Sequence, residues 1–302
     1  MRAVAVLATI ASLHSIASAS SSPNVCANGA HIIVARGTNE PPGSGLIESV
    51  AHGVAAAVPD SQIAPLDYPA AFDNYSASVA AGVDSLKTEL AEYSSRCPQS
   101  KVALMGFSQG AHVIGDTLCG SVGAEPLLLQ FNATLKPMSS SVIDQNVIAV
   151  IFFGDPTHKA SAPWNRGNSI RDGVGNTRET WLRRIISLPS FPLFPHREEP
   201  KPSLTRVLFQ LYPRGDIKMC QQYASKIESW CDTGDLYCDN GNTPGIHRSY
   251  FSKYTPDAVE FVFSRFVAAN ASRAPLAVSP SKSSLALGSA GLLASGRLLE
   301  HH

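Results

Sequence analysis

The chain of 302 residues carries 24 basic and 24 acidic side chains and six cysteines. This balance gives no reason to expect nucleic acid or an anionic membrane as a partner, so we expect a substrate that is neutral or charged only locally. Beyond the N-terminal region, no stretch is long and apolar enough to predict a stable membrane span.

The N-terminus has the pattern of a secretory signal. Arg2 precedes an apolar run from Ala3 to Ala11, and the small residues Ala17–Ala19 follow as a cleavage site. We therefore expect a signal peptide over 1–19 and a secreted, extracellular, monomeric product. Sequons at Asn74, Asn132 and Asn270 are compatible with glycosylation in eukaryotic secretion.

All the cysteines lie after the expected cleavage point: Cys26, Cys97, Cys119, Cys220, Cys231 and Cys238. An even number in an oxidising compartment favours disulfides over metal ligation or a free thiol nucleophile. Fifteen pairings are open from the sequence alone. Cys231 and Cys238 close so short a loop that their pairing is favoured.

Short β-rich runs separated by helical patterns predict an α/β fold with a mostly parallel central sheet flanked by helices. The runs are 31–35, 102–105, 147–153 and 227–230. A helix over 77–95 buries a stripe formed by Val79, Val83, Leu86, Leu90 and Tyr93. A last helix opens with Thr255 as N-cap and Pro256 at its first position, and its buried side consists of Val259, Val262, Phe263, Phe266 and Val267.

The pentapeptide at 106–110, Gly-Phe-Ser-Gln-Gly, lies between the run 102–105 and a helical stretch from Ala111 to Leu118. A serine on a tight strand-to-helix turn needs small neighbours, which Gly106 and Gly110 supply. The alternative is an ordinary turn, but the flanking strand and helix favour Ser108 as the nucleophile of an esterase.

Such a nucleophile needs oxyanion donors. The first is the backbone N–H of Gln109, which follows the serine. The second is expected in the loop 36–40 after the first strand, where Thr38 offers both its N–H and its hydroxyl. The alternative for this loop is an ordinary polar turn, in which Gly37 only allows the required backbone conformation.

Serine also needs a base, and the base needs an acid to orient it. The chain order serine, acid, histidine favours His247, although an ordinary loop histidine is the alternative. We expect the acid in the small cystine loop after 227–230 and choose Asp235, which follows Gly234, over Asp232. The other histidines considered are His31, His52, His112, His158 and His196.

The segment 166–206 is rich in glycine, arginine and proline, so we expect an insertion at the surface of a domain that spans 20–270. Apolar residues between Trp181 and Leu188 have near-helical spacing. They either dock on the domain itself or form a lid over the site. Residues 271–302 are expected to form a disordered tail that ends in the remnant of an expression tag at 299–302.

Four separated motifs, 35–40, 106–111, 154–156 and 231–238 followed by His247, resemble those of the fungal cutinase and acetylxylan esterase family. The resemblance runs from around Cys26 to Phe266. It implies a minimal α/β-hydrolase fold. It also implies that Ser108, Asp235 and His247 form a catalytic triad and that Thr38 and Gln109 form the oxyanion hole. The disulfides that it implies are Cys26 with Cys97, Cys231 with Cys238 and Cys119 with Cys220.

The stretch 239–246 before the histidine is mostly polar, which is closer to acetylxylan esterases than to cutinases. We therefore expect a serine esterase that needs no metal or organic cofactor and acts on plant polyester or acetylated polysaccharide, with preference for acetyl groups. The alternative is a catalytically silent binding protein on the same scaffold, anchored through the modestly apolar end 285–299.

Overall fold

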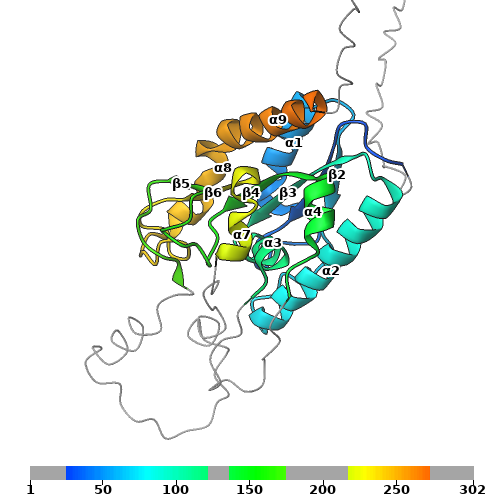
Figure 1. Cartoon of the computed structure of the whole chain (residues 1–302). Helices are drawn as coiled ribbons and strands as arrows, with labels where there is room; N and C mark the ends of the chain where they lie inside the picture. The colour runs from blue at the N-terminus through cyan, green and yellow to red at the C-terminus, as the bar shows by residue number, and fades with distance from the viewer. Residues whose placement is uncertain (1–24, 122–135, 175–216, 273–302) are drawn as a thin grey trace, which may run out of the picture.

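A computed structural model describes residues 25–121, 136–174 and 217–272, which form a layered α/β domain (Figure 1). Its strands are β1 (Ala30–Ala35), β2 (Gln62–Pro65), β3 (Lys101–Phe107), β4 (Val147–Phe153), β5 (Asn165–Gly167) and β6 (Ile227–Cys231). They form one sheet in the order β2-β1-β3-β4-β6-β5, and every pairing within it is parallel. The predicted fold class is therefore confirmed.

Helices cover both faces of this sheet. They are α1 (Glu48–Ala57), α2 (Tyr75–Arg96), α3 (Gln109–Cys119), α4 (Ser140–Asn146), α7 (Lys218–Gln221), α8 (Tyr250–Lys253) and α9 (Thr255–Ala271). Single 3₁₀ turns are η1 (Gly45–Ile47), η4 (Ala224–Lys226) and η5 (Pro244–Arg248). In Figure 1, α1 and α9 lie together on one face, and α2, α3, α4 and α7 lie on the other.

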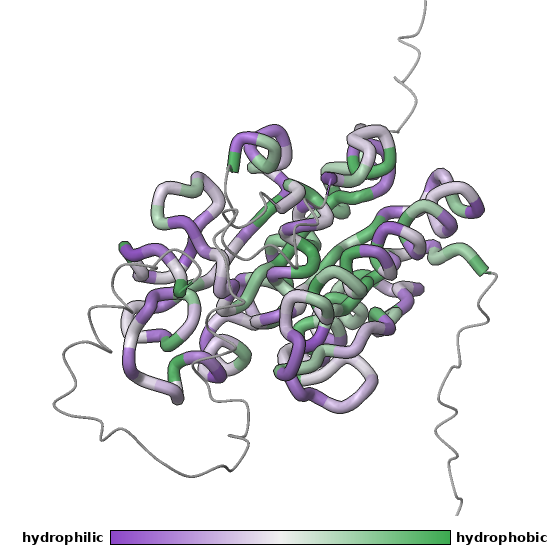
Figure 2. Tube along the Cα trace, turned by 90° about the horizontal axis from the view of Figure 1, so that it is seen from below, coloured by the Kyte–Doolittle hydropathy of each residue, from purple (hydrophilic) through white to green (hydrophobic). Residues whose placement is uncertain are grey.

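The core consists of two apolar layers, one on each face of the sheet. Alternate residues of β1 divide between them: Ile33 packs with the α2 side, whereas Ile32 packs with the α1 and α9 side. The inner strands β1, β3 and β4 are buried on both faces, as parallel strands between helices must be. Figure 2 shows this apolar centre between helices whose outer faces are hydrophilic.

Two features of the last helix differ from the prediction. The N-cap of α9 is Tyr254 instead of Thr255, whose hydroxyl donates to the Phe251 carbonyl (2.6 Å) in the preceding turn α8. Phe263 and Val267 are 38% and 48% exposed, although they were expected on the buried side. Because successive helical residues are about 100° apart, Phe263 turns away when its neighbour Val262 faces the core.

Edge strands β2 and β5 were not predicted. β2 has four residues and ends at Pro65, and β5 has three residues without an apolar pattern. β5 contains the start of the segment that was expected to be inserted at the surface: Arg166 and Gly167 pair with Trp230 and Cys231 of β6. The rest of that segment after Val174, including its proposed lid, lies outside the described residues, as do the expected signal peptide and nearly all of the expected tail.

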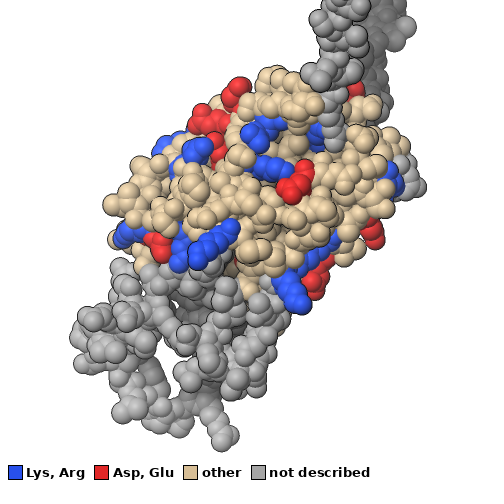
Figure 3. Space-filling view, in the orientation of Figure 1, with Lys and Arg blue, Asp and Glu red and all other residues tan. Residues whose placement is uncertain are grey.

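Three disulfides join the six cysteines, and all three implied pairings are confirmed. Cys26–Cys97 ties the start of the described chain to the end of α2, and Cys119–Cys220 joins α3 to α7. Cys231–Cys238 closes the loop after β6. No helix within the described ranges is long and apolar enough to cross a membrane. On the face in Figure 3, Lys and Arg lie among Asp and Glu, in line with the equal numbers of basic and acidic residues.

Candidate active site

Ser108 occupies a sharp turn between β3 and α3. Its backbone is at φ 52° and ψ −114°, an unfavourable conformation for a residue with a side chain. Its N–H donates to the Phe153 carbonyl at the end of β4 (2.9 Å). A Cβ on Gly106 would lie 2.6 Å from the backbone of Gly110 and Ala111. The turn is therefore closed so tightly that residue 106 must be glycine.

Gly110 is required for a second reason. A Cβ there would lie 1.9 Å from the carbonyl oxygen of Ala35, the last residue of β1. Helix α3 thus begins in direct backbone contact with the neighbouring strand. This contact brings Ser108 next to the loop that follows β1, which carries Thr38.

Asp235 lies in the cystine loop that follows β6, two strands away from Ser108. Its side chain is fully buried, and its Oδ1 accepts hydrogen bonds from the backbone N–H groups of Tyr237 (2.7 Å) and Cys238 (3.1 Å). The preceding Gly234 has φ +96°, which allows the loop to turn at this point. The disulfide and the two backbone donors together fix the orientation of this carboxylate.

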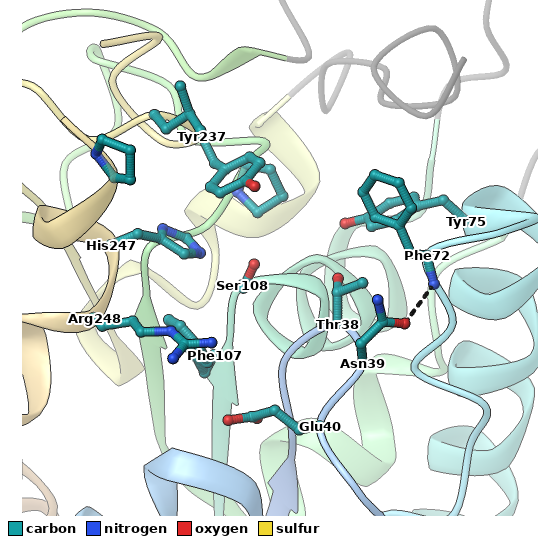
Figure 4. Close-up of a pocket in the computed structure, with 13 residues that line it drawn as sticks. Thr38, Asn39, Glu40, Phe72, Tyr75, Phe107, Ser108, Tyr237, His247 and Arg248 are labelled. Atoms are coloured by element: carbon teal, nitrogen blue, oxygen red, sulfur yellow. Dashed lines mark hydrogen bonds between the residues drawn. The ribbon is translucent and has the colours of Figure 1, made fainter. Parts of the chain in front are cut away.

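His247 bridges the distance between Asp235 and Ser108. Its Nδ1 is 2.9 Å from Asp235 Oδ2 and 3.1 Å from Oδ1, and its ring packs between Phe107 and Tyr237 at centroid distances of 4.9 and 4.5 Å. The other ring nitrogen, Nε2, is buried and has no hydrogen-bond partner among the described residues. Figure 4 shows the imidazole directed toward the Ser108 hydroxyl across the pocket.

The carboxylate of Asp235 is held in its charged form. Burial alone would raise its pKa, but hydrogen bonds from His247, Tyr250 and the Tyr237 backbone outweigh this cost and keep the pKa below its usual range. Asp235 is therefore ionised at neutral pH. A fixed negative charge beside Nδ1 stabilises an imidazolium and selects the tautomer in which Nε2 is free to accept a proton.

Asp232, the alternative acid, faces a different part of the structure. Its carboxylate binds Lys253 Nζ (2.7 Å) and accepts from the hydroxyl of Tyr254 (2.8 Å). It joins the cystine loop to the segment around α8, and its hydrogen-bond partners among the described residues do not include His247.

The side chains of the other described histidines have neighbours other than Ser108, although the backbone N–H of His112 donates to the Ser108 carbonyl (3.1 Å) within α3. His31 stacks on Tyr93 with ring centroids 3.7 Å apart, and His52 is exposed on α1. His112 is buried within α3 beside Asp116, and His158 is buried after β4. His196 lies outside the described residues.

Thr38 lies on the side of Ser108 opposite His247 (Figure 4). The side chain of Gln109 holds it there: Nε2 donates to Thr38 Oγ1 (3.2 Å) and to the Ala71 carbonyl (3.0 Å), and Oε1 accepts from Ser78 Oγ (2.8 Å). Gln109 is also the first residue of α3, where backbone N–H groups have no partner inside the helix. The structure thus brings all five predicted site residues into one region.

Three of these residues, Thr38, Ser108 and His247, line a pocket of about 340 Å³. The aromatic part of its wall consists of Phe72, Tyr75, Phe107 and Tyr237. The polar part consists of Thr38, Asn39 and Glu40 from the loop after β1 and of Arg248 at the end of η5. Glu40 accepts from the backbone N–H groups of Gly37 (2.5 Å) and Leu46 (3.0 Å), which stiffens this loop. Within the described ranges, no cluster of three or more His, Cys, Asp or Glu side chains has the arrangement of a metal site.

A contact that the sequence did not reveal steadies the cystine loop. Asp239 is fully buried and accepts from Arg171, from Ser169 Oγ (2.5 Å) and from the Gly234 N–H (2.7 Å). Burial raises the pKa of Asp239, but these donors outweigh it and hold the pKa below its usual range. The first residues of the segment after β5 thereby clamp the loop that carries Asp235. In a sequence, an aspartate next to a cysteine does not indicate that it makes such contacts.

Gly154, the residue after β4, lies beneath the imidazole. It has φ +61°, and a Cβ there would lie 2.7 Å from Cε1 and 2.9 Å from Nδ1 of His247. We expect Gly154→Ala to lower the free energy of unfolding by about 1–2 kcal/mol and kcat/KM for p-nitrophenyl acetate by on the order of 100-fold, because it displaces the ring. Chemical unfolding and steady-state kinetics measure the two effects.

Gly43→Ala is the matched control. Gly43 also has a positive φ (+125°), but a Cβ there would meet nothing within 4 Å. This variant should lose stability and keep its activity. Equal activity in the Gly43 and Gly154 variants would contradict the role assigned to the space beneath His247.

Comparison with known proteins places this arrangement in a family. A family model described as Cutinase matches residues 26–266. The chain is 30% identical to acetylxylan esterase 2 of Talaromyces purpureogenus over 242 residues, 78% of this chain and 86% of the relative. It is 27% identical to cutinase 11 of Verticillium dahliae over 242 residues, 78% of this chain and 68% of the relative.

A solved structure of an acetylxylan esterase has the same architecture. The alignment has a TM-score of 0.60 and 29% identity and covers 80% of this chain and all of the other. The fold and the family expected from the four motifs are therefore confirmed. The chain belongs to the cutinase family of serine esterases.

Proposed function

We propose that this protein is a secreted esterase that hydrolyses plant cell-wall esters through an acyl-enzyme, preferentially releasing acetyl groups from polysaccharide. The observation that carries the proposal is the paired Asp235 and His247, with a free Nε2 directed toward Ser108 on a strained turn. Nucleophile, base and acid in this order are the groups that acyl transfer requires.

Each residue has a distinct role in this mechanism. Ser108 Oγ attacks the ester carbonyl while His247 Nε2 takes its proton, and Asp235 stabilises the imidazolium. The backbone N–H of Gln109 and the N–H and hydroxyl of Thr38 bind the oxyanion. The imidazolium then returns the proton to the leaving alcohol. Water, activated in turn by His247, hydrolyses the acyl-enzyme.

The surroundings of the pocket support a polysaccharide substrate. The stretch before His247 is mostly polar, and Asn242, Thr243 and Gly245 are exposed beside the pocket, which Pro244 lines. Aromatic side chains such as Tyr237 and Phe72 offer faces on which a sugar ring packs, and Asn39 offers polar atoms beside them. The similarity to acetylxylan esterase 2 of Talaromyces purpureogenus and to a solved acetylxylan esterase structure supports the same preference.

Three disulfides support secretion, because such bonds persist in oxidising compartments. Two of the three sequon asparagines, Asn74 and Asn270, are exposed, as glycosylation requires. The proposed signal peptide over 1–19 is tested by N-terminal sequencing of the secreted protein, which should begin near Ser20.

Covalent labelling tests the chemistry. A fluorophosphonate should modify the protein at Ser108, which mass spectrometry of the labelled peptide identifies, because the reagent requires a serine activated by a base. A binding protein that retains only the scaffold would leave Ser108 unmodified, and that result would reject the proposed mechanism.

A comparison of substrates tests the specificity. Rates are measured on acetylated xylan, on short-chain and long-chain p-nitrophenyl esters and on polyester film. We expect acetate release from xylan and short-chain hydrolysis to dominate. Faster release from long-chain esters and film would instead assign the protein to polyester hydrolysis and contradict the preference for acetyl groups.

A further inference from the structure

We propose that Tyr250 is a positioning residue that controls how Asp235 holds the imidazole of His247. The inference rests on the catalytic roles proposed above. Tyr250 begins α8, three residues after His247, and its side chain is fully buried behind Asp235. Nothing in the motif pattern singled it out, because an aromatic residue at this spacing is typical of core packing.

The hydroxyl of Tyr250 donates to Oδ2 of Asp235 at 2.6 Å. This is the oxygen that lies 2.9 Å from His247 Nδ1. Tyrosine and histidine therefore share one carboxylate oxygen, whereas Oδ1 is also held by the backbone N–H groups of Tyr237 and Cys238. Each oxygen of the acid thus has a fixed donor besides His247.

The direction of the tyrosine hydrogen bond is determined by its other neighbours. The backbone N–H of Asp232 donates to the same hydroxyl oxygen at 3.1 Å, so the phenol must act as acceptor there. Cys238 Sγ lies 3.2 Å away, but it is part of a disulfide and has no proton to donate. The one phenolic proton is therefore directed to Asp235.

The phenol is also fixed in place and in its protonated form. Its ring packs against Phe153, with centroids 5.8 Å apart, and a Cβ on Gly154 would lie 3.2 Å from the ring carbon Cε2. Burial, followed by the charge of Asp235, raises the pKa of Tyr250. The group therefore remains a hydrogen-bond donor throughout the pH range of ester hydrolysis.

This geometry gives the hydroxyl two effects on the site. It restrains Oδ2 at the distance that places the imidazole over Gly154. It also withdraws part of the carboxylate's negative charge from His247. Without the hydroxyl, the ring would move more freely, and Asp235 would attract the proton on the imidazolium more strongly. The base would then be released for catalysis only at higher pH.

Tyr254 provides a matched control one turn later. Its hydroxyl donates to a carboxylate too, Asp232 Oδ1 at 2.8 Å, and its ring stacks with that of Tyr250. Asp232 does not contact His247, and Tyr254 does not line the pocket. Tyr254→Phe therefore removes the same kind of hydrogen bond from the same region without touching the acid of the proposed triad.

The test compares the pH dependence of kcat and kcat/KM for p-nitrophenyl acetate in wild type, Tyr250→Phe and Tyr254→Phe. We expect Tyr250→Phe to lower kcat by between about 10-fold and 100-fold with little change in KM, and to move the acid limb of the profile to higher pH. Tyr254→Phe should keep the wild-type limb and kcat. If the two variants have the same profile, Tyr250 has only a structural role and the proposal is overturned.

A second substitution covers the case in which Tyr250→Phe does not fold. Incorporation of 3-fluorotyrosine at position 250 preserves the ring and strengthens the phenol as a donor, so the acid limb should move to lower pH. An unmoved limb would contradict the proposal. Failure of the underlying mechanism is recognised separately, by wild-type protein that a fluorophosphonate does not label at Ser108.

Discussion

Ser108→Ala is expected to lower kcat for p-nitrophenyl acetate by on the order of 10⁵-fold to 10⁶-fold, because it removes the nucleophile and leaves binding and oxyanion stabilisation intact. The substitution deletes one oxygen and creates no steric conflict in the turn. The free energy of unfolding should therefore stay within about 0.5 kcal/mol of wild type. Steady-state kinetics measure kcat, and urea unfolding measures the free energy of unfolding.

Two further variants make this result specific. Ser94→Ala removes a buried hydroxyl on α2 and should leave kcat unchanged. Ser108→Gly should be as inactive as the alanine variant but more stable than it by about 1 kcal/mol, since glycine tolerates the positive φ of this turn. Retained turnover in either Ser108 variant would reject Ser108 as the nucleophile.

The positions of the site residues follow from the order of the strands. Parallel strands end at the same edge of the sheet, and the loops after them meet there. β1 and β3 are neighbours, so Thr38 lies beside Ser108. β6 is separated from β3 by β4, and the imidazole of His247 spans this intervening strand. Gly154 follows β4 at that point, and its missing side chain leaves room for the ring.

Much of this arrangement could be predicted from local patterns. A glycine-flanked serine between an apolar strand and a helix identifies the turn at Ser108, and a cystine loop after a strand identifies the region of Asp235. Such features depend on a few consecutive residues, so the sequence carries them directly. The strand 147–153 was likewise evident, because buried parallel strands form continuous apolar runs.

The remaining features depend on contacts between distant segments. Nothing near Tyr250 in the sequence indicates that its hydroxyl reaches Asp235. The Asp239–Arg171 ion pair likewise joins a residue that precedes β6 in the sequence to one that follows it. The exposure of Phe263 was missed because spacing alone does not define how wide the buried stripe of a helix is. β5 is too short to have a hydropathy pattern, and it is a strand only because it pairs with β6.

Asp235→Asn is expected to lower kcat by about 10⁴-fold, through the tautomer of His247. The backbone N–H groups of Tyr237 and Cys238 both donate to Oδ1, so the amide oxygen of asparagine must occupy that position. Its NH₂ group then takes the place of Oδ2 and donates to His247 Nδ1. The ring is thereby forced to carry its proton on Nε2, which can no longer accept the proton of Ser108.

Asp232→Asn in the same cystine loop is the matched control, and it also tests the alternative acid. Asp232 is buried and pairs with Lys253 and Tyr254 instead of His247, so its loss should reduce stability and leave kcat near that of wild type. Steady-state kinetics of both variants, with fluorophosphonate labelling rates, measure the difference. If Asp232→Asn were the more damaging change, the acid would be Asp232. An unaffected Asp235→Asn would show that the imidazole is oriented without this carboxylate.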